Sequence, residues 1–393
     1  MRIWSITTHA IADDARIRRQ CDALVAAGHD VVAVGAPGGS SWTPDFEVVE
    51  VEGRRRSSAA DVAYAIWMGS AGRTRMGAER VFWSFPENRR IHAAAQAAKA
   101  DLYLANDWKT LPIASRAAAA TGGRYAFDSQ EWALEEFLEQ RLWRLLFPRY
   151  IHHLQAAFIG GAAFVSTVCE SLAEDIRIRY GLPSRPLVIR NVPPYQHEAF
   201  RPAGSPLVVL YHGQYLPNRG LETLVESVYL WPADRVLHLR GYASWRYKGV
   251  ETRIRQKGAD AEAEGRIVFH PRSPVDEIVN MAALADVGIH PMLSWNNQTR
   301  STLPNKLFEY IMAGLALCVS DLPEMARVVR EHDLGVLLPE VTPESIAETV
   351  AGLERTAVDE WKRHSLEAAR GLCWEQEQKL LIQAVESIAT NRH

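Results

Sequence analysis

This 393-residue sequence lacks most of the short cysteine, phosphate-binding and metal-binding motifs from which a function is commonly recognised. The four cysteines, Cys21, Cys169, Cys318 and Cys373, form no CxxC pair, so the sequence predicts neither a disulfide framework nor a zinc site and is typical of a reducing compartment. The 44 Lys and Arg residues are outnumbered by 47 Asp and Glu residues, for a formal net charge of -3. Because nucleic-acid-binding proteins usually carry a basic surface, this balance gives no support to nucleic-acid binding.

The sequence also lacks leader-like and membrane-spanning segments. Its first residues do not show the charged-then-apolar layout of a signal peptide. The longest uncharged apolar runs, such as 156–165, fall far short of the roughly 18 residues that span a bilayer. We therefore expect a cytoplasmic protein with no transmembrane segment, for which peripheral contact with a membrane surface stays open.

Phosphate- and metal-binding loops of familiar types are absent too. The turn TTHAIADD after the first expected strand has no glycine triad, and GAPGG at 35–39 lacks the GxGxxG spacing, so NAD or FAD binding is not supported. No GxxxxGK loop followed by Ser or Thr occurs, and no Asp-x-Asp pair stands in a context suited to a metal. The sequence therefore predicts no cofactor and no metal site.

Strand and helix patterns alternate along the chain, which predicts α/β layers built on parallel sheets. At 393 residues the chain exceeds a usual single domain, so we expect two. The stretch 191–206, rich in proline and glycine, predicts the boundary between a first domain at 1–195 and a second at 205–370. The expected strands are 2–6, 30–34, 46–51, 101–105, 125–127, 162–168 and 187–189 in the first domain, and 207–211, 236–239, 267–269, 286–290, 315–319 and 336–338 in the second.

Two parts of the first domain are harder to interpret. Arg54, Arg55 and Arg56 predict a solvated loop, and 131–159 reads as a helix interrupted near Pro148. A basic and aromatic cluster lies on that helix, made of Arg141, Trp143, Arg144, Phe147 and Arg149. The cluster fits either a face for a membrane surface or a lipid acceptor, or an interdomain helix whose arginines reach out to solvent.

The stretch STLPNKLFEYIMAG at 301–314 carries the clearest chemical signal. Pro304 suits the first position of a helix, which leaves the N–H groups of Asn305 and Lys306 free at the positive end of the helix dipole. Lys306 adds a full positive charge, and Glu309 follows on the same face one turn deeper. A cation for phosphate beside a carboxylate for sugar hydroxyls describes a nucleotide-sugar pocket. The alternative is a capped helix with a surface Lys and Glu.

Polar residues also follow expected strands elsewhere. The strand at 207–211 leads into GQYLPNRG, where Asn218 is a suitable N-cap and Arg219 adds a cation, so a second anion site is expected there. In the first domain, Asn106 and Asp107 follow the strand at 101–105, at the edge where open α/β sheets bind ligands.

Together these segments resemble the GT-B glycosyltransferases, specifically the retaining family 4. NKLFEY, AGLALCVSDLPE and GVLL follow one another as in that family, with an Asn-Lys-x-x-Glu variant of its donor-binding motif. The resemblance implies that Glu309 hydrogen-bonds the donor ribose and that Arg219 contacts the donor diphosphate. The implied donor-binding residues are Gly213, Arg219, Arg272, Ser273, Pro304, Asn305, Lys306 and Glu309, and the implied catalytic residues among them are Arg219, Lys306 and Glu309.

The first half of the chain resembles the same family more loosely. GHDVVAV is similar to its second strand, ANDW to a strand-end segment, and YAFDSQEW to a segment that commonly reads Asp-Ser-His-Glu, whose His is here Gln130. Gln214 and Ser301 stand where many members have a basic residue and a glutamate. The implied acceptor-side residues are His9, Arg16, Asn106, Asp107 and Gln130.

The resemblance implies two Rossmann-like domains that face each other across a cleft, with a C-terminal helix at about 371–393 crossing back to the first. It implies sugar transfer from a UDP- or GDP-type sugar nucleotide to a hydroxyl acceptor, with retention of configuration and without a metal. The acceptor could be a glycan, a lipid-linked molecule or a small molecule. The departures at Gln130, Gln214 and Ser301 keep two alternatives open, a non-catalytic sugar-nucleotide-binding subunit and a GT-B sugar-nucleotide epimerase.

Overall fold

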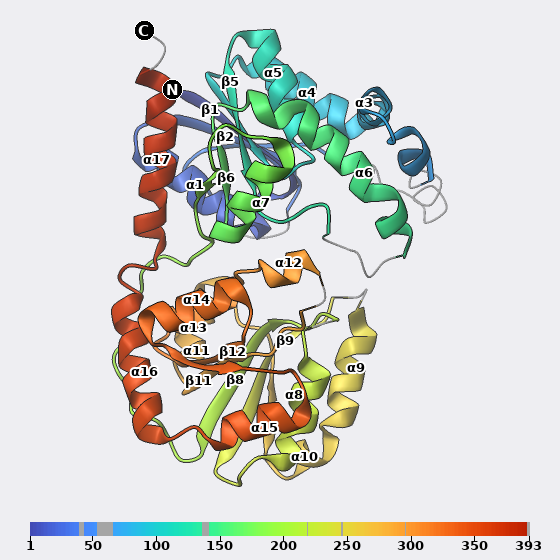
Figure 1. Ribbon diagram of the computed structural model, residues 1–393. Helices are drawn as coiled ribbons and strands as arrows, with labels where there is room; N and C mark the ends of the chain where they lie inside the picture. The colour runs from blue at the N-terminus through green and yellow to red at the C-terminus, as the bar shows by residue number, and fades with distance from the viewer. Residues whose placement is uncertain are drawn as a thin grey trace. The chain divides into compact units, whose positions relative to one another are not determined.

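The computed structural model describes residues 1–38, 43–52, 66–135, 141–217, 219–244, 247–294 and 296–390. The chain forms two compact units (Figure 1): unit 1 combines residues 1–190 with the C-terminal residues from 377 onward, and unit 2 spans residues 191–376. The predicted arginine loop at 54–56 and the predicted N-cap Asn218 lie outside the described residues.

Unit 1 contains a seven-stranded sheet in the order β3-β2-β1-β4-β5-β6-β7, in which all neighbouring strands are parallel. The strands are β1 (Arg2–Ala10), β2 (Asp30–Ala36), β3 (Glu47–Glu50), β4 (Leu102–Asn106), β5 (Arg124–Ser129), β6 (Val165–Thr167) and β7 (Leu187–Val188). Parallel neighbours require long crossover connections, which helices supply here. The helices are α1 (Ala15–Ala26), α3 (Arg75–Ser84), α4 (Pro86–Ala98), α5 (Leu111–Thr121), α6 (Arg141–Phe158), α7 (Glu170–Tyr180) and a short helix at 66–71.

The helix α6 differs from the sequence interpretation in two ways. It begins at Arg141 rather than at 131, because 131–135 form a turn held by local backbone hydrogen bonds. It also continues through Pro148 without a break. A proline inside a helix removes one backbone hydrogen bond, and the burial of Tyr150 and Leu154 against the rest of unit 1 offsets that loss.

A buried ion pair joins α1 to β5 inside unit 1. Nε and Nη2 of Arg16 each donate to the Asp128 carboxylate at 2.8 Å, and Nη1 donates to the Ile189 carbonyl at 3.0 Å. Gln20 and Ser166 donate to the same carboxylate. Burial would raise the pKa of Asp128, but the Arg16 guanidinium and these hydrogen bonds outweigh it and hold the pKa below its usual range. Arg16, expected on the acceptor side, is therefore a structural residue whose donors are already used.

Unit 2 contains a second parallel sheet, with six strands in the order β10-β9-β8-β11-β12-β13. The strands are β8 (Leu207–Gln214), β9 (Arg235–Tyr242), β10 (Ile267–His270), β11 (Val287–His290), β12 (Ala316–Ser320) and β13 (Gly335–Leu338). The helices are α8 (Leu221–Ser227), α9 (Lys248–Lys257), α10 (Ala259–Ala263), α11 (Ile278–Ala282), α12 (Asn297–Arg300), α13 (Asn305–Met312), α14 (Pro323–His332), α15 (Pro343–Ala351) and α16 (Arg355–Ala368). The last helix, α17 (Trp374–Thr390), starts in unit 2 and continues in unit 1.

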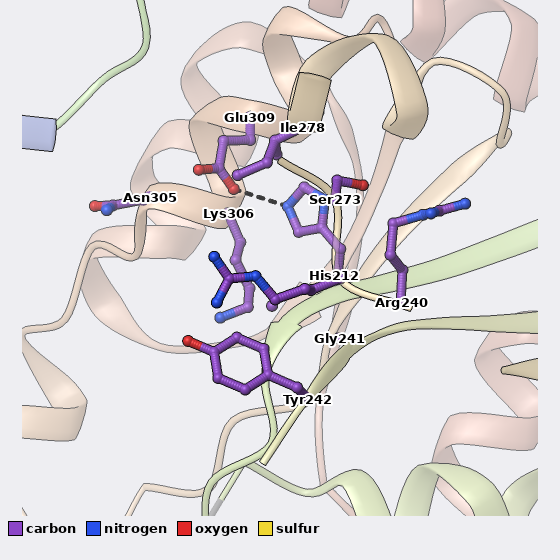
Figure 2. A pocket seen from close by; sticks show the side chains of 11 residues that line it. His212, Arg240, Gly241, Tyr242, Ser273, Ile278, Asn305, Lys306 and Glu309 are labelled. Carbon is purple, nitrogen blue, oxygen red and sulfur yellow. Dashed lines mark ion pairs between the residues drawn. The ribbon is translucent and has the colours of Figure 1, made fainter. Parts of the chain in front are cut away.

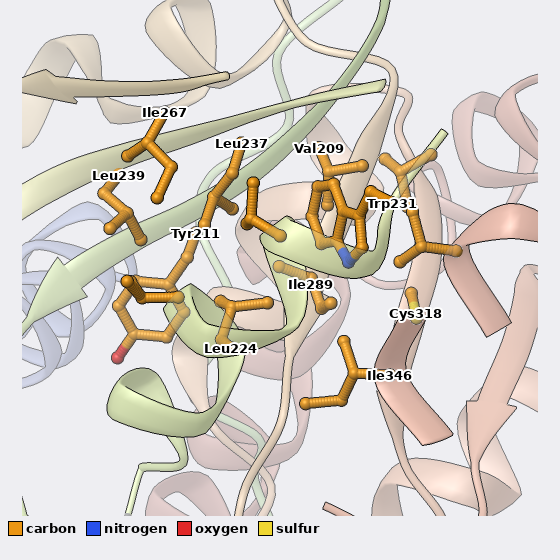
Figure 3. Close-up of a cluster of buried hydrophobic side chains, with 14 of the residues drawn as sticks. Val209, Tyr211, Leu224, Trp231, Leu237, Leu239, Ile267, Ile289, Cys318 and Ile346 are labelled. Carbon is orange, nitrogen blue, oxygen red and sulfur yellow. The ribbon is translucent and has the colours of Figure 1, made fainter. Parts of the chain in front are cut away.

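The core of unit 2 forms around the central strands β8 and β11. Figure 3 shows Tyr211 and Ile289 from these strands packed with Leu224 of α8 and Ile346 of α15, all of which are buried. The near-continuous apolar character of the strands reflects their burial on both faces. Two parallel α/β sheets confirm the fold class that the alternating pattern predicts. In the part of the chain that the structure describes, no helix is both long and apolar enough to cross a bilayer.

Replacing Arg16 by Met is expected to destabilise unit 1 by about 3–5 kcal/mol, because the Asp128 carboxylate would stay buried without its counter-charge. Urea unfolding followed by circular dichroism measures the change. The double variant Arg16→Met/Asp128→Leu removes both charges and should lose much less than the two single variants added together. Strictly additive losses would contradict the coupling, and Arg124→Met, at an exposed position of β5, is the control.

Candidate functional site

The helix predicted to begin at Pro304 is α13, and it begins one residue later. Pro304 is its N-cap, with φ -73° and ψ 145°. Because the fixed φ of proline suits either position, the sequence did not separate them. No side chain of the described residues caps this helix. The N–H groups of Asn305 and Lys306, the first two in the helix, therefore lie at the positive end of the dipole as two donors for an anion.

The ammonium group of Lys306 lies against the backbone of Gly213, near the end of β8. A Cβ on Gly213 would be 2.5 Å from Cε and 2.8 Å from Nζ of Lys306, and Gly213 has a φ of +111°, so the position requires glycine. Burial and the positive charge of Arg219 lower the pKa of Lys306 to about 8, and Glu309 opposes this shift. Nζ also lies 5.4 Å from the centre of the Tyr211 ring, a contact that favours its charged form.

Arg219 brings a second positive charge close to Lys306. Its Nη1 lies 3.1 Å from Sδ of Met292. Among the described residues, neither Arg219 nor Lys306 forms an ion pair with a carboxylate. His290 is fully buried beside them, where burial and the charges of Lys306 and Arg219 hold its pKa well below the usual value and keep the ring neutral. This part of unit 2 therefore carries positive charge that, within the described ranges, Glu309 offsets only in part.

Glu309 lies one helical turn after Asn305 and contacts His212 of β8. Its Oε2 is 2.8 Å from Nε2 of His212 (Figure 2). The His212 ring stacks on Tyr310 with centroids 4.6 Å apart, and the backbone N–H of His212 donates to the Tyr310 hydroxyl at 3.1 Å. The stacking places the imidazole beside the Glu309 carboxylate. The sequence analysis did not predict a role for His212. Its position directly before Gly213, at the carboxyl end of a strand, could have indicated one.

One cavity of about 250 Å³ in unit 2 brings six predicted donor-side residues together. They are Gly213, Arg272, Ser273, Asn305, Lys306 and Glu309. Figure 2 shows Glu309 reaching toward His212 from α13, whereas the Lys306 side chain extends toward the side of the cavity where Tyr242 lies. Pro304 and Arg219 do not line the cavity, and Arg219 acts on it through the charge that it places near Lys306.

The side of this cavity formed by β9 and the residues after β10 was only partly predicted. The Arg272 guanidinium lies 5.0 Å from the centre of the Tyr242 ring. The Ser273 hydroxyl is buried without a hydrogen-bond partner among the described residues. Sequence reasoning missed the remaining wall residues, Arg240, Gly241, Tyr242 and Ile278. Arg240 and Tyr242 follow the expected strand at 236–239, and this position could have indicated that they line a ligand site.

The predicted acceptor-side residues of unit 1 do not share one opening. Asn106 is buried and donates to Ser5 Oγ at 2.9 Å, so it ties β4 to β1 rather than facing a ligand. His9 is exposed, with Nδ1 4.0 Å from Oδ2 of Asp14. Asp107 accepts from the Trp108 N–H at 2.6 Å, and Gln130 is half-buried.

Unit 1 does contain a cavity of about 320 Å³ that the sequence did not predict. It lies at the carboxyl ends of β1, β2 and β4, where Thr8, Ala36 and Trp108 form part of its wall. None of the predicted acceptor-side residues lines it. Within the described residues, no group of three or more His, Cys, Asp or Glu side chains could hold a metal ion.

Two family models match the chain in succession. The model described as "Glycosyl transferase 4-like domain" matches residues 14–192, and the model described as "Glycosyl transferases group 1" matches residues 206–355. No curated protein sequence matches the chain.

Solved structures resemble the chain over its whole length. The sucrose-phosphate synthase of Thermosynechococcus elongatus is 15% identical, with 100% of both chains covered and a TM-score of 0.76. The HepE protein of Anabaena, in complex with UDP and glucose, is 14% identical, with 98% of this chain and 100% of its own covered and a TM-score of 0.72. WaaG, a glycosyltransferase involved in lipopolysaccharide biosynthesis, is 14% identical, with 97% and 98% covered and a TM-score of 0.69. At these identities the likeness shows the fold alone.

The depressed pKa of Lys306 can be measured directly. Competitive labelling with acetic anhydride, read by mass spectrometry, is expected to give a midpoint at about pH 8 for Lys306. Arg219→Ala should move the midpoint upward, because it removes a positive charge that disfavours the ammonium form. Arg253→Ala, an exposed cation of the same unit, should leave it unchanged. A Lys306 midpoint near the ordinary lysine value would contradict the burial of this ammonium group.

Proposed function

We propose a specific reaction for this chain, which belongs to the family 4 glycosyltransferases and has the GT-B fold that its sequence predicts. It transfers a sugar from a nucleoside-diphosphate sugar to a hydroxyl acceptor, with retention of the anomeric configuration. In this proposal unit 2 binds the donor and unit 1 binds the acceptor.

The proposal rests mainly on the positive charge that Arg219 and Lys306 place close together in unit 2. Arg219 and Lys306 have no carboxylate partner among the described residues, and the uncapped start of α13 adds two N–H donors. Holding two half-buried cations close together without an ion-pair partner is costly, so this arrangement fits a ligand that brings its own negative charge. A diphosphate supplies such charge in a compact form.

The cavity in unit 2 accounts for the other parts of a sugar nucleotide. Glu309, held by His212, is placed to accept hydrogen bonds from the ribose hydroxyls. The base would lie along the segment of Arg272 and Ser273, where the Ser273 hydroxyl still needs a partner. The HepE structure in complex with UDP and glucose supports a UDP-type donor, and a GDP-type donor is the alternative.

The residues that hold the diphosphate also explain how transfer would be accelerated. Breaking the bond between sugar and phosphate builds negative charge on the phosphate oxygens while the sugar becomes oxocarbenium-like. Lys306, Arg219 and the N–H groups of α13 are fixed in advance around that charge, so they stabilise it without reorganising. Charged hydrogen bonds contribute roughly 1.5–3 kcal/mol each. We infer that these groups serve in place of a metal ion, and we assign no nucleophile.

Lys306→Ala and Arg219→Ala are each expected to lower the rate of sugar transfer by at least about tenfold, since each removes about 1.4 kcal/mol or more of transition-state stabilisation. Initial rates with UDP-sugars and GDP-sugars across a broad acceptor panel measure the effect. Arg330→Ala, which removes an exposed cation of unit 2, is the matched control.

Three other outcomes would contradict the proposed reaction or indicate a different function. Near-normal turnover in both variants would overturn the diphosphate assignment. Nucleotide binding without transfer or donor hydrolysis would indicate a binding subunit, which the departures at Gln130, Gln214 and Ser301 first suggested. Interconversion of the donor sugar without an acceptor would identify an epimerase.

The affinity for UDP is expected to fall as the pH rises through about 8. The charged form of Lys306 binds the diphosphate, and the pKa of about 8 means that the free chain loses this charge near that pH. Well above pH 8 the loss approaches about tenfold per pH unit, the linkage limit for one proton. Isothermal titration between pH 6.5 and 9.5 measures it. Lys306→Ala should bind more weakly with a much flatter profile, and an equally steep profile in that variant would assign the effect to another group.

A further inference from the structure

The cavity of unit 1 has a wall that is mostly apolar. Its side chains include Phe82 and Phe85 around the junction of α3 and α4, Met68 from the helix at 66–71, Tyr150 from α6 and Trp108 after β4. All five are buried to about nine-tenths or more. At about 320 Å³ the cavity is large enough for a substantial apolar group, and burying such a group is favourable in proportion to its area.

The lining of this cavity includes few side chains that are polar along their length, namely Thr8, Glu87, Asn88 and Lys109. The Asn88 side chain already donates to the Phe82 carbonyl at 2.8 Å, and Lys109 lies 3.6 Å from Asp107. A sugar or another polyhydroxylated group would bring hydroxyls for which this wall offers few partners, and each unpaired hydroxyl would oppose binding. The wall therefore favours a hydrocarbon group over a glycan.

Some of the elements that line the cavity also expose large apolar side chains to solvent. Large exposed apolar side chains occur on three of them: Ile66 and Trp67 at 66–71, Met76 on α3 and Leu145 on α6. Leu145 and Met76 are the most exposed, at 75% and 83%.

Two stretches of these elements, 66–76 and 141–158, carry charge of one sign, whereas Glu79 lies further along α3 and Glu87 lies on α4. Within 66–76 and 141–158 the sequence contains five arginines and no aspartate or glutamate. On α6, Arg141, Arg144 and Arg149 are exposed. Arginine and apolar side chains together are typical of surfaces that contact anionic lipid headgroups.

We propose that the cavity of unit 1 binds the long aliphatic chain of a lipid-linked, anionic acceptor that is presented at a membrane surface. The inference rests on the proposed function, because it names the class of acceptor for the same transfer reaction. The cavity receives part of the chain, and the arginines of α6 hold the anionic end and the surrounding anionic lipid. An aromatic acceptor would use the apolar wall but would leave the arginine-rich surface without a role.

A series of n-alkyl phosphates from butyl to tetradecyl, titrated into the full chain by calorimetry, tests the cavity. Affinity should rise about fourfold for each added methylene until the cavity is full, the gain expected for burying one such group. Val51→Asp, which places a charge on a half-buried part of the wall, should weaken dodecyl phosphate at least tenfold, whereas Val51→Ile should not. Affinity that does not depend on chain length, or phenyl phosphate binding as tightly as dodecyl phosphate, would overturn the proposal.

Sedimentation with vesicles tests the membrane part. The chain should bind vesicles of phosphatidylcholine with 30% phosphatidylglycerol and not vesicles of phosphatidylcholine alone. Arg144→Glu/Arg149→Glu should lower this binding at least tenfold. Arg124→Glu, at the opposite end of the sheet where β5 begins, should not. Absence of binding to the anionic vesicles would also overturn the proposal. UDP affinity, which depends on unit 2, is measured alongside, so that failure here is distinguishable from failure of the proposed function.

Discussion

The site in unit 2 depends on one lysine ammonium group held against the backbone of a glycine. Lys306 reaches from the start of α13 to Gly213 near the end of β8, and the hydrogen bond from the His212 N–H to the buried Tyr310 hydroxyl joins these two elements. Burial and Arg219 both disfavour its charge, and Glu309 and the ring of Tyr211 only partly compensate. A rigid parallel sheet can hold such an unfavourable arrangement, because the cost of the charge is small beside the burial of the surrounding apolar residues.

Arg16 in unit 1 differs from Arg219 and Lys306 in unit 2 in the counter-charge that the fold provides. In unit 1 the buried guanidinium of Arg16 donates to a carboxylate and to a backbone carbonyl, so its role is to connect α1 with β5. In unit 2 Arg219 and Lys306 lie close together, and the described residues provide neither with an ion-pair partner. The difference between a structural charge and a functional one is thus a matter of whether the fold itself supplies the counter-charge. The type of residue does not decide it.

The sequence predicted the layers of the fold well, because alternating apolar strands and amphipathic helices are local patterns. It also predicted the residues around the start of α13, since proline, lysine and glutamate at this spacing depend on one helix alone. It did not predict that Arg16 is buried, because its partner Asp128 lies 112 residues away. The contact of His212 with Glu309 and the cavity of unit 1 were missed for the same reason. Each is created by elements that the chain brings together only in three dimensions.

The conformation of Gly213 has a consequence for how proteins of this design can diverge. A side chain there would need a backbone angle that L-amino acids rarely adopt and would also collide with the lysine, so a single substitution would disturb two features at once. Gln130, Gln214 and Ser301 are not bound by this double restriction. Divergence that keeps the Lys306 ammonium group in place therefore requires Gly213 to stay glycine, whereas the backbone imposes no such requirement at Gln130, Gln214 or Ser301.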